Sequence, residues 1–590
     1  MERSGHRPGV PVRRRGAGML GPMLARVGTF LLQGIDAAAC EVEIDHDHTA
    51  MDARPAVVGL PDTAVKESLD RVRSALTNSG YAFPPGRVLI SLAPADLRKE
   101  GPLYDLPMAL GLMIAQGMLA DRSATPARPG RGPAGPVGPG RAQGVPGRAP
   151  GPAPAAGSAA HQELLDDLAA LDAAGGVGGA ATEPPDIRSL LFAGELALDG
   201  RLRPVRGVIA MAALARRMGL RGVVVPSQNA AEASVVPGIE VWGPATLAEL
   251  VGLLRGELDL APTPPTDVPG LLRQAPASVD FADVRGQEAV KRAIVVAAAG
   301  GHNILMLGPA GTGKSMMAKA LPGVLPPLTP DEAIDVTRIY SAAGALPEGV
   351  SLITARPVRS PHHTASASAV IGGGAVPRPG EVSLAHHGVL FLDELPEFPR
   401  DVLETLRQPL EDHVVTIARS HSAVRFPASF MLVAAMNPTP KGDVARDQVG
   451  KRAMDRYLAR LSGPLIDRID LHVEAPAVPW KDLADTDAPR GSSTAQMRAV
   501  VLAARRFQAG RQGPVPNARL SGRRLDELAP MDDDARALLG QAITELGLSA
   551  RAYDKLRRVA RTIADIDSAH TVALAHVAEA VQYRLLDRRP

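Results

Sequence analysis

The stretch 308–315 carries the clearest chemistry in the chain. It reads GPAGTGKS and fits the pattern G-x-x-x-x-G-K-[ST]. Glycines let a backbone turn tightly enough to aim its N–H groups at phosphate oxygens, and a helix beginning there adds partial positive charge. We expect Lys314 to reach the β- and γ-phosphates of a nucleotide and the Ser315 hydroxyl to ligate Mg²⁺. The predicted phosphate contacts are Gly308, Pro309, Ala310, Gly311, Thr312, Gly313, Lys314 and Ser315.

Two later apolar runs each end in polar residues that suit the same site. The run 388–395, GVLFLDEL, ends in Asp393, predicted to hold Mg²⁺, and in Glu394, predicted to orient and deprotonate the attacking water. The run 430–437, FMLVAAMN, ends in Asn437, predicted to hydrogen-bond the γ-phosphate or the water. The alternatives are a solvated acidic pair and an ordinary turn residue before a proline.

The elements that position these residues follow from apolar runs and composition. Residues 304–307 and 316–321 predict a strand before the glycine-rich loop and a helix after it. A length of 590 residues predicts two or three domains. The net charge of +2 confines any nucleic-acid contact to local patches. The single cysteine, Cys40, excludes an internal disulfide and fits a cytoplasmic protein, and no apolar run reaches the roughly 18 residues of a membrane span.

Composition also divides the chain into segments. Residues 1–22 are expected to be a disordered tail and 122–187 a low-complexity insertion, because neither can bury enough apolar surface to offset its ordering entropy. Residues 258–278 are predicted to be a linker, and 191–205 a hairpin turning at Asp199 and Gly200. Five helical patterns follow residue 493. The predicted domains are 23–257, 279–480 and 493–590.

Longer stretches carry a resemblance to a known family. They are GPAGTGKS (308–315), RPVRSPHHTASASAVIGGGAVPRPGEVSLAHHGVLFLDELPEF (356–398), AAMNPTP (434–440), LSGPLIDRIDLHVE (461–474) and LSARAYDKLRRVARTIADI (548–566). The chain resembles the magnesium-chelatase-like AAA+ ATPases, and more closely the ComM/YifB family of competence-related proteins. The resemblance implies an α/β protein: a Lon-protease-like (ribosomal S5-like) α+β domain, an AAA+ P-loop core, and a C-terminal helical lid.

Two arginines receive roles from this resemblance. Arg468 matches the arginine that similar ATPases point into the neighbouring subunit's nucleotide, with Arg460 as the second candidate. Arg551 matches a sensor arginine of the lid. A guanidinium fork suits the neutralisation of charge in a transition state. A finger supplied by a neighbour implies a head-to-tail homohexamer. The alternative for each arginine is a surface ion pair.

The family also implies contacts with DNA. Residues 412–427 predict a hairpin with Arg419 and His421 near its tip, which in similar motors lines a central channel and grips a phosphate backbone. The alternative is a solvated hairpin. Residues 359–385 correspond to an insertion over the pore, and their pair His362 and His363 lacks a third ligand at convincing metal spacing. Where many relatives carry cysteines after the Asn-Pro, this chain has Thr439 and Pro440.

The N-terminal domain lacks the residues of a Lon-type protease. Aligned with the family's serine–lysine dyad, the two positions hold Leu103 and Ile209, and neither apolar side chain can attack a carbonyl or move a proton. We therefore expect a domain that keeps the fold and either assembles the ring or binds a partner.

The combined prediction is a homohexameric, ATP- and Mg²⁺-dependent motor. It acts on single-stranded or branched DNA by branch migration during recombination of incoming DNA, with recombination proteins as further partners. The alternative is a magnesium-chelatase-type ATPase that remodels a protein partner. An ATP-dependent protease is disfavoured by Leu103 and Ile209, and a non-catalytic scaffold by the intact nucleotide residues.

Overall fold

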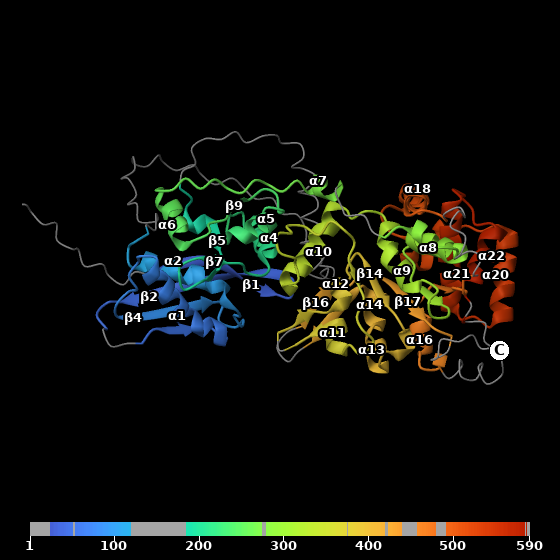
Figure 1. Cartoon of the computed structure of the whole chain (residues 1–590), viewed down its shortest axis with the longest axis horizontal. Coiled ribbons are helices and arrows are strands. Elements are labelled where there is room, and N and C mark those ends of the chain that lie inside the picture. The colour runs from blue at the N-terminus through green and yellow to red at the C-terminus, as the bar shows by residue number, and fades with distance from the viewer. Residues whose placement is uncertain are drawn as a thin grey trace, which may run out of the picture.

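The computed structural model describes residues 24–50, 54–119, 184–273, 279–374, 376–418, 423–438, 457–478, 491–584 and 586. The predicted tail, nearly all of the predicted insertion, and Arg419 and His421 lie outside these ranges. The molecule is elongated, with the N-terminal domain at one end and the C-terminal helices at the other, and helix α10 (Pro330–Ala343) lies between them (Figure 1).

The first part of the N-terminal domain is a four-stranded sheet in the order β1-β2-β4-β3, packed against helices. Along β2, the buried Cys40, Val42 and Ile44 alternate with more exposed residues, so one face of the strand enters the core. The Asp62 carboxylate caps the first helix by accepting the Val65 N–H at 2.8 Å. The elements are β1 (Ala25–Gln33), β2 (Asp36–Asp47), β3 (Ala56–Val58), α1 (Thr63–Asn78), β4 (Arg87–Ala93), η1 (Pro102–Tyr104) and α2 (Asp105–Ala115).

The second part is a parallel three-stranded sheet, β5-β8-β9, with helices beside it. The predicted hairpin is only partly right. Residues Glu195–Leu196 and Leu202–Arg203 do pair antiparallel, but Leu190–Phe192 joins the parallel sheet instead because all three of its residues are buried. The elements are η3 (Ile187–Ser189), β5 (Leu190–Phe192), β6 (Glu195–Leu196), β7 (Leu202–Arg203), α4 (Val208–Arg217), β8 (Gly222–Val224), α5 (Ser227–Ala233), β9 (Glu240–Trp242) and α6 (Leu247–Arg255).

The predicted linker 258–278 is not entirely extended chain. It contains α7 (Val268–Arg273), whose Val268 is buried and whose Leu271 and Leu272 pack in the same apolar cluster as α4. The prolines and threonines before this helix are typical of a linker, so the sequence pattern does not indicate that its three apolar residues are packed. This part of the connection is therefore docked on the N-terminal domain.

The central domain is built on a five-stranded, all-parallel sheet in the order β11-β14-β17-β10-β18. Every residue of β17 is buried, as expected of a strand covered on both faces. Along β14, Val389 and Phe391 face one apolar cluster while Leu390 and Leu392 face another. The strands are β10 (Ile304–Leu307), β11 (Val358–Arg359), β14 (Val389–Leu392), β17 (Met431–Met436) and β18 (Leu471–Glu474).

Helices and two small hairpins surround this sheet. The predicted hairpin of 412–427 is present, since β15 (Val414–Ala418) pairs antiparallel with β16 (Ala423–Pro427). A second hairpin joins β12 (Gly372–Gly373) and β13 (Arg378–Pro379). The other elements are η4 (Phe281–Asp283), α8 (Glu288–Gly300), α9 (Lys314–Ala320), η5 (Leu321–Gly323), α10, α11 (Ala367–Ile371), α12 (Glu381–Leu384), η6 (Leu395–Glu397), α13 (Arg400–Thr405), α14 (Arg407–Asp412) and α16 (Gly463–Ile466).

The C-terminal region is helical, as its periodicity predicts. Its apolar faces join one cluster with α8 and the sheet, so the two regions share a core. Helix α21 shows why the pattern is readable: Leu556, Val559 and Ile563 recur at helical spacing and are all buried. The elements are α18 (Thr494–Gln512), η7 (Asn517–Arg519), α19 (Gly522–Leu528), α20 (Asp533–Leu546), α21 (Ala550–Ile566) and α22 (Leu574–Gln582).

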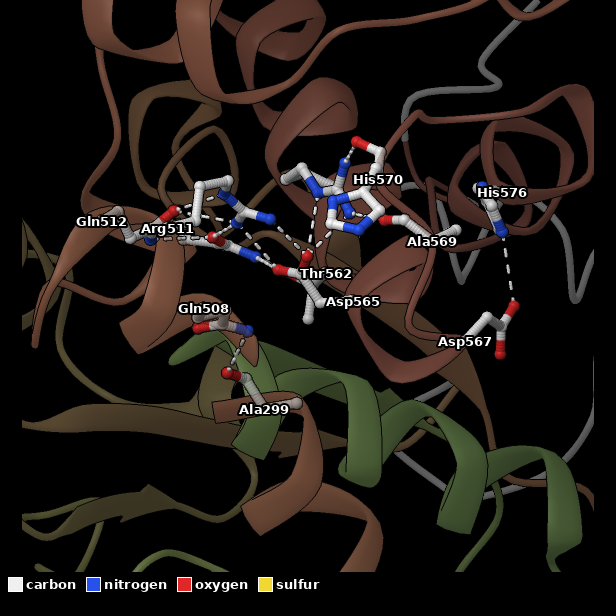
Figure 2. A network of polar contacts seen from close by, with 12 residues as sticks. Ala299, Gln508, Arg511, Gln512, Thr562, Asp565, Asp567, Ala569, His570 and His576 are labelled. Carbon is white, nitrogen blue, oxygen red and sulfur yellow. Dashed lines mark hydrogen bonds and ion pairs between the residues drawn. The ribbon is translucent and has the colours of Figure 1, made fainter. Parts of the chain in front are cut away.

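A buried carboxylate ties these helices together. Figure 2 shows Asp565 of α21 facing Arg511 of α18. Arg511 donates to its two oxygens at 2.6 and 3.0 Å, and Arg561 adds two hydrogen bonds from its own turn of helix at 3.0 and 2.7 Å. The Asn517 amide of η7 donates at 2.7 Å. One fully buried Asp565 thereby fixes α18, η7 and α21 relative to one another.

We predict that Asp565→Ala destabilises the C-terminal helices by about 3–5 kcal/mol, because two guanidiniums would lose their buried counter-charge. The measurement is urea denaturation of the full chain, followed by the helical circular dichroism signal. Asp533→Ala is the control, since the Asp533 side chain is 97% exposed, and it should change stability by less than about 0.5 kcal/mol. Equal effects of the two substitutions would contradict this account of the network.

Candidate nucleotide site at the carboxyl edge of the sheet

The glycine-rich loop leaves the sheet at the end of β10 and enters α9 at Lys314. Gly311 and Gly313 have φ values of +80° and +85°, a region that side chains disfavour. Gly308 is needed for a different reason: a Cβ there would lie 2.1 Å from the backbone oxygen of Ala475, just beyond β18. The loop therefore depends on both backbone freedom and close packing against the neighbouring strand.

Two of the predicted polar partners, Asp393 and Asn437, contact this loop. The Ser315 hydroxyl donates to Asp393 Oδ2 at 2.6 Å. Lys314 Nζ lies 3.3 Å from Asn437 Oδ1 and donates to the carbonyls of Gly308 and Pro309, each at 2.7 Å. Burial lowers the pKa of the Lys314 ammonium, while the nearby Asp393 carboxylate opposes that shift.

This arrangement suits Mg²⁺ and a polyphosphate. A hydroxyl and a carboxylate in contact supply the oxygen ligands that Mg²⁺ prefers, and the cation would balance phosphate charge there. The Lys314 ammonium is held by loop carbonyls that lie beside the first turn of α9, where phosphate oxygens would exchange with them as partners.

Glu394 lies at the rim of the site. Its φ of +52° turns the chain sharply after β14, and its N–H donates to Asp393 Oδ1 at 3.0 Å. Its side chain is half exposed, and Oε2 lies 3.4 Å from Nδ1 of His363. The predicted base is therefore accessible to water. The His363 ring in turn stacks on His362 with centroids 4.1 Å apart and meets the buried Phe398 edge-on.

Arg468 and Arg551 do not join this group. Both line a cavity at the opposite, amino edge of the sheet, together with Asn303 and Asp470, the residues just before β10 and β18. Arg468 donates to the Pro464 carbonyl at 2.5 Å and contacts Glu411, and Arg551 is exposed at the start of α21. A four-residue strand spans about 13 Å, so neither arginine lies beside its own chain's phosphate loop.

The second candidate, Arg460, lies elsewhere. It pairs with Glu397 at 2.9 Å and covers the Tyr457 ring at 5.5 Å from its centroid. Its guanidinium group is therefore already engaged by these two neighbours. Arg468, partly buried at the sheet edge, has the more constrained position.

The positions aligned with a protease dyad are apolar and lie in one cluster. Ile209 is fully buried in α4, and Leu103 of η1 packs against the same group of residues. The Ile209 N–H donates to the buried Glu232 carboxylate at 3.3 Å, and burial raises the pKa of Glu232. Ser341 of α10 also donates to Glu232 and accepts the Gly207 N–H at 2.9 Å. The region has become a contact between the N-terminal domain and α10.

Sequence reasoning missed two features. The contact of His363 with Glu394 joins residues 31 positions apart, and the local sequence offers only a pair of histidines. In the described part of the chain, the one group of three metal-ligand side chains is Asp335, His386 and His387, and it does not include His362 or His363. The cationic cavity at the amino edge is lined by residues from segments between 301 and 558, so no single motif predicts it.

A strand, a glycine-rich loop and a helix, with Ser315 against an aspartate at the end of β14, define a P-loop protein of the AAA+ class. Family models agree: magnesium chelatase subunit ChlI matches 280–483, its C-terminal part 491–584, and a further ChlI model 42–126 and 168–229. In the described part of the chain, no helix combines the length and apolar character needed to cross a bilayer.

Sequence similarity to known proteins covers almost the whole chain. The protein YifB of Salmonella typhimurium is 38% identical, covering 96% of this chain and 98% of its own. The competence protein ComM of Haemophilus influenzae is 39% identical, covering 90% and 92% respectively. The magnesium-chelatase 38 kDa subunit of Rhodobacter capsulatus is 26% identical, covering 35% of this chain and 61% of its own. The chain belongs to the ComM/YifB family of magnesium-chelatase-like AAA+ proteins.

We predict that Lys314→Ala weakens binding of ATP with Mg²⁺ by about tenfold or more, because the only buried ammonium of the loop is removed. Lys319→Ala on the same helix is the matched control, since Lys319 is exposed, and it should bind as the unmodified chain does. The measurement is titration with a fluorescent ATP analogue. Equal affinities for the two variants would place the phosphates elsewhere.

Proposed function

We propose that the chain is an ATP-hydrolysing motor that assembles into a homohexameric ring and acts on DNA. The observation that supports hydrolysis best is the contact of Ser315 with Asp393 at 2.6 Å, with Lys314, Asn437 and Glu394 around it. In this proposal Ser315 and Asp393 hold Mg²⁺, Lys314 and Asn437 hold the γ-phosphate, and Glu394 accepts the proton of the attacking water.

The distribution of charged residues between the two sheet edges supports the proposed assembly. The nucleotide residues lie at the carboxyl edge, and Arg468 and Arg551 lie at the amino edge. In this proposal a second copy, placed head to tail, brings these arginines to the phosphates, and repetition of that contact with a closing rotation gives a ring. We assign Arg468 as the finger and Arg551 as the sensor in that contact.

The proposed substrate is single-stranded or branched DNA, and the proposed task is branch migration during recombination of incoming DNA, together with recombination proteins. The ComM relative, named for competence, supports this role. The β15–β16 hairpin, which follows α14, also supports it, because Arg419 and His421 come between its two strands in sequence and are predicted to contact phosphates. A protease role is not supported, since Leu103 and Ile209 carry no reactive group.

A second candidate is remodelling of a protein partner, as in the chelatases. The match to the magnesium-chelatase 38 kDa subunit favours it. The two candidates share the nucleotide chemistry and differ in what stimulates it.

Glu394→Gln should lower ATP hydrolysis by roughly 10²-fold or more while ATP binding persists, because an amide cannot accept the proton of water. Glu404→Gln is the control, because Glu404 of α13 is only partly exposed but pairs with Arg407 away from the loop, and it should keep normal turnover. Measuring phosphate release with and without single-stranded, duplex and four-way-junction DNA separates the substrates. Stimulation by single-stranded or junction DNA supports the DNA motor, and turnover indifferent to all three favours the protein-remodelling role.

Mixing variants tests the finger in trans. Arg468→Ala and Glu394→Gln chains should each be inactive alone, yet an equimolar mixture should recover part of the turnover, because an intact Glu394 then meets an intact Arg468 across some interfaces. Arg460→Ala should need no such rescue. Mixtures no more active than their components would exclude an arginine supplied by the neighbour.

A further inference from the structure

A cavity of about 900 Å³ opens at the amino edge of the central sheet. One wall consists of the residues at which strands begin: Asn303 before β10, Gly388 before β14, Asp470 before β18, and Met431 of β17. The other wall is formed by α18, η7 and α21. The cavity therefore lies a full strand length from the phosphate loop, which leaves the sheet at its carboxyl edge.

Basic side chains dominate the chemistry of this cavity. Among the described residues, seven basic side chains and five acidic ones line it. The basic ones are Arg356, Arg468, Arg505, Arg519, Arg551, Lys555 and Arg558, and the acidic ones are Glu332, Glu411, Asp467, Asp470 and Asp554. Three of the acids are already matched by individual cations: Lys555 with Asp470 at 3.2 Å, Arg356 with Glu332 at 2.9 Å, and Arg468 with Glu411. The remaining arginines outnumber the remaining acids.

Arg505 of α18 and Arg519 of η7 are the clearest cations in excess. The Arg505 guanidinium donates one bond, to the Ala298 carbonyl at 3.0 Å, and its buried Nε–H has no hydrogen-bond partner among the described residues. Arg519 is exposed and contacts the Ser429 hydroxyl. Among the described residues, Glu332 is the carboxylate that opposes the lowered pKa values of both, and Arg356 already binds it.

Burial and the excess of positive charge lower the pKa values of basic groups in the cavity. Burial, together with the nearby Arg356, lowers the pKa of Arg505 to about 10. Burial and the nearby Arg519 lower the pKa of His413 to about 4, so this neighbour is neutral near pH 7 and adds no cation. A bound anion would relieve the repulsion between these guanidiniums and satisfy the Arg505 Nε–H.

The cations stand on a rigid frame. Asp565 joins α18, η7 and α21, as Figure 2 shows for α18 and α21, and Gln508 of α18 donates to the Ala299 carbonyl at 3.0 Å. Arg505 lies one turn before Gln508, and Arg519 lies two residues after Asn517. The network thus holds the segments of α18 and η7 that carry both arginines, and preorganisation of this kind favours binding.

We propose that this cavity is a second phosphate-binding site, which takes a compact polyphosphate between Arg505 and Arg519. Guanidinium forks match phosphate oxygens two at a time. A concave site of this volume suits a ligand the size of a nucleotide or an inorganic polyphosphate rather than a duplex. The polyphosphate comes either free from solution or on a nucleotide carried by a second copy of the chain, and its chemistry is the same in both cases.

The test uses the full chain with Lys314→Ala, so that the phosphate loop contributes little. Tripolyphosphate is titrated without Mg²⁺ and its binding followed by calorimetry. Arg505→Gln with Arg519→Gln should lose affinity by about tenfold or more. Arg506→Gln is the matched control, because Arg506 is the exposed neighbour on α18 and does not line the cavity. Should the double variant fail to fold, Arg519→Gln alone, at an exposed position, carries the test.

A second arm separates the two sources. In the Glu394→Gln background with ATP and Mg²⁺, self-association is measured by light scattering. Loss of tripolyphosphate binding in the Arg505 and Arg519 variant supports uptake of free polyphosphate. Absence of tripolyphosphate binding, with ATP-dependent association lost in that variant and kept in Arg506→Gln, supports a nucleotide carried by a second copy. If neither binding nor association depends on Arg505 and Arg519, the proposal is wrong. Neither arm measures hydrolysis, so this outcome is independent of the proposed ATPase chemistry. The second source alone, a nucleotide carried by a second copy, rests on the head-to-tail assembly proposed above.

Discussion

The common direction of the five central strands is the constraint on which the rest of the molecule depends. Because β14, β17 and β10 run parallel and in register, with Leu392 opposite Ala434 and Ala434 opposite Leu305, their carboxyl ends meet at one edge. Asp393, Asn437 and Gly308 follow those ends directly and so emerge side by side. The same polarity brings the strand beginnings, and the arginines beside them, together at the other edge. The residues around the glycine-rich loop and the arginines therefore lie at opposite edges of the same sheet.

Local patterns predicted the nucleotide site because each of its parts is contiguous in sequence. The glycine-rich loop needs positive φ at Gly311 and Gly313, and an apolar run ending in an aspartate needs only a buried strand. The C-terminal helices were equally predictable, since α20 and α21 carry apolar stripes and begin at the N-cap residues Asp532 and Ser549. In these segments local and tertiary preferences agree.

Other features depend on tertiary contacts that no short window contains. Leu190–Phe192 reads as one arm of a hairpin, yet it pairs parallel with a strand some 30 residues later because both of its faces become buried. Helix α7 follows a proline-rich stretch that is typical of a linker, and it forms where Val268 packs into an apolar cluster. The amino-edge cavity has no pattern at all, because Arg505 and Arg519 face it only after α18 and η7 have docked. Sequence reasoning therefore found the residues around the glycine-rich loop, whose motifs are local. It named Arg468 and Arg551 only through a family resemblance and missed the cavity that packing forms around them.

The N-terminal domain is joined to the central domain by buried contacts. The turn between β1 and β2 packs against the β15–β16 hairpin, where Ile35 and the fully buried Phe426 share a cluster with Tyr340 of α10. Gly34 leaves no room for a side chain there, since a Cβ would lie 2.6 Å from Val424. The buried contact of Glu232 with Ser341 fixes the same domain to the other side of α10. Because interiors pack closely, a displacement of the hairpin must either carry the N-terminal domain with it or break this cluster. The hairpin proposed to contact DNA is therefore braced at its base by a domain that lacks the Lon-type dyad at Leu103 and Ile209.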